Sequence, residues 1–139
     1  MTSKDIQIPR KITTQLLHLA QLSPELEICG LIGSQDGLPT TCYPIANSAE
    51  QPQQRYLLDA SEQIAAMVKM RNSGEDLFAI YHSHPNSPAL PSATDVEMAA
   101  YPDALYLIIS LDTKGVLEMR GFKIADHHAR EMTLILGGC

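Results

Sequence analysis

The sequence predicts an α/β domain in which a mixed β-sheet is flanked by helices. Amphipathic segments alternate with apolar strands in the first part of the chain, and a strand-rich region follows. Residues 104–112 form a continuous apolar run, which is typical of a strand buried on both faces of a sheet. A chain of 139 residues fits one domain, spanning residues 1–139, and can bury roughly two thirds of the surface that its unfolded form exposes.

A helix is expected near the start of the chain, and a hairpin after it. Apolar side chains recur every three or four positions from Pro9 to Leu22, and Pro9 can open the first turn. The positions that carry this pattern are Ile12, Leu16, Leu19 and Leu22. Residues 27–37 then predict a buried strand closed by a Gly-containing turn, and residues 40–47 predict its hairpin partner.

The middle of the chain predicts a second helix at residues 61–72. A polar loop at 48–54 and a short strand at 55–59 lead into it. Asp59 followed by Glu62 matches the pattern of a capping box at the start of this helix. One face of the helix is expected to carry Ile64, Met67, Val68 and Arg71.

Strands and one short helix complete the expected order of elements. The strands are expected at residues 77–84, 104–112, 116–126 and 131–136. A proline-rich loop and a helix at 92–101 separate the first two of them, and a turn at 112–115 follows the second. This order of helices and strands favours a mixed sheet covered by helices.

The composition argues against nucleic-acid and membrane partners. The formal charge is −6, and the chain has no cluster of Lys and Arg side chains of the kind that contacts a phosphate backbone. It also has no run approaching the roughly 18 apolar residues that a membrane span needs, and its start does not resemble a secretory signal. We therefore expect a cytoplasmic protein whose partner is a small molecule or another protein.

Several residues outside the main motif invite a metal or redox interpretation, and a structural one is preferred for each. Cys29, Cys42 and Cys139 are odd in number and lack CxxC spacing, so neither a disulfide framework nor a zinc ribbon is indicated. Residues 127 and 128 are two adjacent histidines. On a strand, adjacent side chains point to opposite faces and could not bind one metal ion together, so a solvated turn is favoured. His18 has no partner at ligand spacing.

The motif that carries chemistry begins with two histidines one residue apart. His82 and His84 end the strand expected at 77–84, and side chains two apart on a strand project from the same face. Three prolines stiffen the loop that follows and delivers Asp95. Two imidazoles and one carboxylate suit Zn²⁺, and three protein ligands leave a fourth tetrahedral position open for water. An open position indicates catalysis rather than a purely structural metal.

Such a site still needs a general base and a group that stabilises an oxyanion. Glu27 is the strongest acidic candidate outside the motif, and Glu25 is its near rival. The Ser92 hydroxyl, three residues before Asp95, can face the oxygen that becomes negative in a tetrahedral intermediate. Ser92 and Asp95 also match a helix cap, and Ser92 can serve both purposes. The combination predicts a metal-dependent amide hydrolase.

These residues together resemble the signature of the JAMM (MPN+) metalloprotease family. The resemblance rests on Glu27 in "EICG", on "HSHP" at 82–85 and on "SATD" at 92–95, with ten residues between His84 and Asp95. It implies a mixed sheet between helices, similar to the fold of cytidine deaminases. It also implies one catalytic Zn²⁺. Under the resemblance, the zinc ligands are His82, His84 and Asp95, the general base is Glu27 and the oxyanion is stabilised by Ser92.

The resemblance further implies a substrate that ends in Gly-Gly. Members of the family cleave the amide bond after the Gly-Gly tail of ubiquitin or, in bacteria, of ubiquitin-fold sulfur carriers. The compact chain favours a small bacterial carrier, with release of cysteine or a short peptide. Two alternatives remain: a non-enzymatic protein-binding module of MPN type, and a relative of the DNA-repair-associated branch, which the acidic charge disfavours.

The chain itself ends in Gly137-Gly138-Cys139, which resembles a sulfur carrier that has captured cysteine. A flexible tail is the favoured interpretation. The alternative hypothesis is that this tail mimics a product or substrate and enters the zinc site of its own or a neighbouring molecule.

Overall fold

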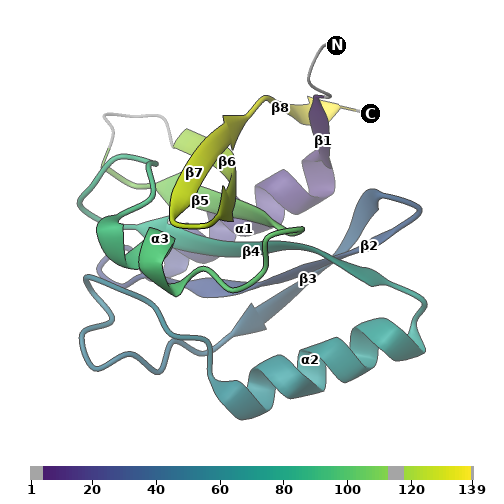
Figure 1. Cartoon of the computed structure of the whole chain (residues 1–139), viewed down its shortest axis with the longest axis horizontal. Helices are drawn as coiled ribbons and strands as arrows, with labels where there is room; N and C mark the ends of the chain where they lie inside the picture. Colours follow the sequence, from purple (N-terminus) through teal and green to yellow (C-terminus); the bar gives the residue numbers. More distant parts are fainter. Residues whose placement is uncertain (1–4, 113–117, 139) are drawn as a thin grey trace.

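A computed structural model describes residues 5–112 and 118–138 of the chain (Figure 1). The strands in this part are β1 (Ile6–Pro9), β2 (Cys29–Gln35), β3 (Leu38–Ile45), β4 (Asp76–His84), β5 (Leu105–Ser110), β6 (Glu118–Ala125), β7 (His128–Met132) and β8 (Leu134–Gly138). The helices are α1 (Arg10–Leu22), α2 (Ala60–Asn72) and α3 (Ala93–Met98). No helix in the described residues is long and apolar enough to span a membrane.

Six strands form one mixed sheet in the order β3-β2-β4-β5-β6-β7. β4 and β5 are parallel, whereas the other neighbouring strands are antiparallel. One apolar cluster joins α1 to the sheet, and a second joins α2 and α3 to its other face. Every residue of β5 is buried, as expected for the apolar run at its position. The predicted fold class, a mixed sheet flanked by helices, is confirmed.

The helix α2 is correctly placed, but two apolar residues of the face expected to carry them point to solvent. Ile64 and Val68 are 64% and 45% exposed, and the buried residues are Ala66 and Met70. Ala66 and Met70 belong to the apolar cluster that joins α2 to the sheet, and Met67 packs against it. In α1 the same correction applies at the end of the helix, where Leu22 is 65% exposed.

The cap of α2 is half of the predicted capping box. The Asp59 carboxylate accepts a hydrogen bond from the Glu62 amide at 3.0 Å, as expected for an N-cap. The Glu62 carboxylate does not return the bond. It accepts instead from the Ala46 amide at 2.8 Å, which ties the first turn of α2 to the end of β3.

Two predicted elements near the site are shorter than expected. Residues 55–59 form no strand, and only Leu58 makes an isolated bridge, with Asn47. The helix expected to reach residue 101 ends at Met98. The Tyr106 hydroxyl accepts hydrogen bonds from the amides of Ala100 and Tyr101, which a longer helix would have used.

The end of the chain differs most from the prediction. The segment 131–136 is divided between β7, which pairs with β6, and β8, which pairs in parallel with the unpredicted strand β1. Gly138 is opposite Pro9 in this small sheet, so a flexible tail is wrong for the two glycines. The turn expected at 112–115 and the start of the strand expected at 116–126 lie largely outside the described residues, as does Cys139.

Candidate metal and catalytic site

The two histidines of the motif lie side by side at the end of β4, a central strand of the sheet. Both are buried, with 1% and 3% of their surface exposed. The Nε2 atoms of His82 and His84 are 3.1 Å apart. The alternation of side chains along β4 therefore brings two ring nitrogens to one point, as the sequence predicts.

Asp95 reaches the same point from the first turn of α3. Its Oδ2 atom lies 3.1 Å from Nε2 of His82 and 3.2 Å from Nε2 of His84. A complete capping box orients it: the Ser92 amide donates to Asp95 Oδ2 at 2.9 Å, and the Asp95 amide donates to Ser92 Oγ at 3.0 Å. The local "SATD" sequence thus both starts α3 and aims the carboxylate at the histidines.

The proline-rich loop fixes the orientation of His84. Nδ1 of His84 is 2.8 Å from the Pro88 carbonyl, which can only accept, so Nδ1 carries the proton and Nε2 carries the lone pair. The Ser110 hydroxyl donates to the Ser87 carbonyl at 2.7 Å and holds the same loop to β5. The free lone pair on His84 therefore points toward His82 and Asp95.

Glu27 lies just before β2 and contributes a buried carboxylate. It is 5% exposed, whereas its rival Glu25 is exposed to solvent. Glu27 Oε1 is buried and has no hydrogen-bond partner within residues 5–112 and 118–138. Burial raises the pKa of this carboxyl from 4.5 to about 7. Glu27, His82 and His84 offer donor atoms that all lie within 4.8 Å of one another.

The donor set of this site fits a divalent metal ion. Bonds of about 2.0 to 2.1 Å in a tetrahedral zinc site place neighbouring ligand atoms about 3.3 Å apart. His82, His84 and Asp95 approach this spacing, with donor atoms 3.1 to 3.2 Å apart. Burial lowers the pKa of His82, which keeps its ring neutral. Burial alone would raise the pKa of Asp95, but hydrogen bonds from His82 Nε2 and from the Ser92 amide hold it well below its ordinary value.

Ser92 is exposed and is hydrogen-bonded to Asp95. Its oxygen accepts the Asp95 amide, so the hydroxyl proton remains free to donate to another group. The cap and an oxyanion contact are therefore compatible in one residue. The structure brings all five predicted site residues together: Ser92 is bonded to Asp95, Asp95 lies against both histidines, and Glu27 lies near the same histidines.

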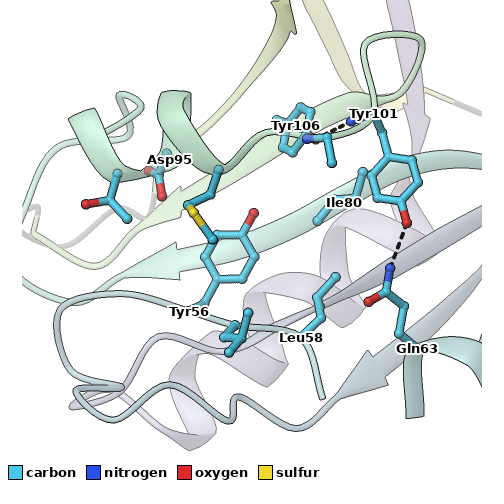
Figure 2. A pocket seen from close by; sticks show the side chains of 11 residues that line it. Tyr56, Leu58, Gln63, Ile80, Asp95, Tyr101 and Tyr106 are labelled. Carbon is cyan, nitrogen blue, oxygen red and sulfur yellow. Dashed lines mark hydrogen bonds between the residues drawn. The ribbon is translucent and has the colours of Figure 1, made fainter. Parts of the chain in front are cut away.

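Tyr56 is part of the site and was not predicted. Its ring stacks on the His82 ring with centroids 4.3 Å apart and an angle of 21° between the planes. A cavity of about 260 Å³ opens beside it, with Tyr56 and Asp95 at one end and the hydrogen-bonded pair Gln63 and Tyr101 at the other (Figure 2). No motif in the sequence marks Tyr56 as a site residue. The segment around it, residues 55–59, is predicted only as a short strand.

The remaining histidines and the C-terminal glycines lie away from this site. His127 has a φ of +62° in the exposed turn between β6 and β7, as expected, whereas His128 begins β7 and is also exposed. His18 is exposed on α1. β8 belongs to a separate two-stranded sheet with β1, and Figure 1 shows this small sheet apart from α3.

The fold and this site define a JAB1/MPN-type domain. The crystal structure of a JAB1/MPN domain protein from Archaeoglobus fulgidus matches with a TM-score of 0.62 at 13% identity, over 96% of this chain and 100% of that one, which is a likeness of fold. The solution structure of a protein from Desulfitobacterium hafniense matches with a TM-score of 0.83 at 33% identity, over 94% and 91% of the two chains.

The chain belongs to the prokaryotic homologues of the JAB domain, a family that matches residues 9–123. The CysO-cysteine peptidase of Mycobacterium tuberculosis is 33% identical over 83% of this chain and 79% of its own length. The desampylase of Haloferax volcanii is 40% identical over 64% of this chain and 66% of its own length. The resemblance to JAMM-type enzymes is thereby confirmed, and so is the expectation of a peptidase.

Proposed function

We propose that the protein is a zinc-dependent metallopeptidase that hydrolyses the amide bond after the Gly-Gly tail of a ubiquitin-fold sulfur carrier, with cysteine as one leaving residue. The observation that carries this proposal is the convergence of His82, His84 and Asp95 within 3.2 Å, next to the buried carboxylate of Glu27. In this assignment the first three residues hold the metal and Glu27 serves as the base.

A zinc ion held by His82, His84 and Asp95 would lower the pKa of a water molecule and polarise the substrate carbonyl. Glu27 accepts a proton from the attacking water, whose oxygen forms a bond to the carbonyl carbon of the last glycine. Ser92 donates its free hydroxyl proton in a hydrogen bond to the carbonyl oxygen as negative charge develops there. The carbon–nitrogen bond then breaks, and Glu27 passes its proton to the leaving amine.

A pKa of about 7 suits Glu27 for this exchange. A carboxyl group titrating near neutral pH can both accept and return a proton during turnover. The free Oε1 atom supports the same role, because no neighbouring group within the described residues occupies it in a competing hydrogen bond.

The names of the relatives support a carrier substrate. They include a CysO-cysteine peptidase, a desampylase and a probable TtuB-protein conjugate cleaving protease from Thermus thermophilus, the last 40% identical over 42% of this chain and 39% of its own. A Gly-Gly tail lets the chain pass closely by the metal donors, because no Cβ obstructs it. The cavity beside Asp95 leaves room for a neighbouring residue that does carry a side chain.

Intact mass spectrometry tests this proposal. A ubiquitin-fold carrier that ends in Gly-Gly-Cys is incubated with protein whose zinc content has been measured, and in parallel with the Glu27→Gln variant. The expected result is loss of one cysteine with the wild type only. A carrier ending in Gly-Ala-Cys is the matched substrate control and should be cleaved more slowly. No cleavage of any Gly-Gly carrier by zinc-loaded protein would favour the protein-binding module.

Three further predictions accompany this function. We propose a cytoplasmic enzyme formed by a single domain over residues 1–139, with no nucleic acid among its partners. The charge of −6 supports the last point, because a phosphate backbone would be repelled. A DNA-binding assay across a range of salt concentrations checks it, and salt-sensitive binding would contradict it.

A further inference from the structure

Ser83 lies between the two histidines of β4, and its side chain projects to the opposite face of the strand. It is fully buried. Its hydroxyl oxygen accepts a hydrogen bond from the Ile28 amide at 2.9 Å, and its proton is directed to the Leu26 carbonyl oxygen at 3.4 Å. Leu26 and Ile28 are the two neighbours of Glu27, so one side chain of β4 binds the backbone on both sides of Glu27.

The position of the Glu27 carboxylate depends on backbone anchors of this kind. The segment belongs to no regular strand at Glu27. The Glu27 amide donates to the Pro52 carbonyl at 2.8 Å, and the Asn47 side chain donates to the Glu27 carbonyl at 3.0 Å. The Ser83 amide adds a bond to the Ile28 carbonyl at 3.0 Å. At the end of the side chain, by contrast, Oε1 has no partner among the described residues.

We propose that Ser83 is a positioning residue that fixes Glu27 relative to His82 and His84. This inference rests on the proposed function, in which Glu27 moves the proton. His82 and His84 then present two ring nitrogens on one face of β4. Ser83, between them, holds the backbone on both sides of Glu27 from the other face. Because a misplacement of about 1 Å can lower a rate by about 10²-fold, loss of the Ser83 hydroxyl should affect turnover more than binding.

Steady-state kinetics of Ser83→Ala test the role, with Ser34→Ala as the matched control. Ser34 is also a buried serine of the same sheet, and its hydroxyl faces the carbonyl of Asp76 rather than the site. We expect kcat of Ser83→Ala to fall about 10- to 100-fold, with KM for the carrier and one zinc per chain unchanged. Ser34→Ala should keep the wild-type kcat. A rise in KM alone, or an unchanged kcat, would overturn the proposal.

A double-mutant cycle with Glu27→Gln identifies the group through which Ser83 acts. If Ser83 works by placing Glu27, then Ser83→Ala should change the residual rate of Glu27→Gln less than twofold. An equal loss in both backgrounds would mean that Ser83 acts independently of Glu27, and the proposal would be wrong.

Hydrogen exchange at the Ile28 amide provides a readout that needs no activity. Ser83→Ala removes the acceptor of this amide, so its exchange should become at least about tenfold faster, whereas Ser34→Ala should leave it unchanged. Wild-type protein without activity on any carrier would overturn the proposed function. An unchanged Ile28 exchange rate would overturn the role of Ser83, whether or not the enzyme is active.

Discussion

At the scale of single residues, the account depends most on Glu27. Glu27→Gln keeps the size of the side chain but cannot accept a proton, so we expect kcat to fall about 10²- to 10⁴-fold with one zinc per chain retained. Glu25→Gln is the control, because Glu25 is exposed and should be replaceable without effect. Kinetics and metal analysis on both variants check this. Full activity of Glu27→Gln would transfer the role of base to another group.

The buried state of Glu27 also predicts how the metal-free protein responds to pH. The carboxyl holds its proton up to about pH 7 in the folded chain, but only to its ordinary pKa of 4.5 when unfolded. The folded state therefore binds more protons between these values, and stability from this group is lost as the pH rises through them. Glu27→Gln should remove this contribution, so that its stability falls less steeply from pH 4.5 to 7.

Urea unfolding of the metal-free wild type and Glu27→Gln across this range measures the difference. Only the gap between the two curves reports on Glu27, since other groups titrate in both proteins. Parallel curves would show that the carboxyl has the same pKa folded and unfolded.

At the scale of elements, α3 combines a structural and a proposed chemical role in Ser92. Glycine is nearly as good an N-cap as serine, but it has no hydroxyl. Ser92→Gly should therefore lower stability by only a few tenths of a kcal/mol while reducing kcat about 10²- to 10³-fold. Ser92→Thr retains both functions and is the control. Thermal unfolding and kinetics separate the two effects, and an active Ser92→Gly enzyme would exclude an oxyanion contact.

Elements with a local cause could be predicted from the sequence. The Asp59 cap of α2 and the strand that ends in His82 and His84 follow from neighbouring residues, and both are found. The burial of Ala66 and Met70 in α2 could not be predicted, because it depends on which side of the helix packs on the sheet. The pairing of β1 with β8 joins the two ends of the chain and leaves no short-range signal.

The same distinction between local and long-range causes applies to the residues of the candidate site. A capping box formed within four consecutive residues, from Ser92 to Asp95, orients the Asp95 carboxylate. Its place beside the histidines could therefore be expected. Tyr56, in the segment before α2, stacks on His82 of β4, and a contact between segments so far apart in the chain leaves no local signal. Glu27 was separated from Glu25 by the family resemblance, and burial now provides a physical reason for the distinction.

At the scale of the whole molecule, bound metal should add to stability. A ligand at 100 times its Kd stabilises the folded state by about 2.7 kcal/mol, which corresponds to a rise in Tm of roughly 5 to 11 °C for a chain of this size. Asp95→Asn is the control, because it retains a side chain that can cap α3 but loses the charge of the proposed ligand. Differential scanning fluorimetry with and without zinc checks this. Equal shifts in both proteins would place the metal elsewhere.

The most direct test of the central claim is a zinc titration of the metal-free protein, with cleavage of a Gly-Gly-Cys carrier followed by intact mass. The account predicts no cleavage without metal, a linear rise in rate up to one zinc per chain and no further rise beyond it. Cleavage by the metal-free protein, or no cleavage at one zinc per chain, would contradict it.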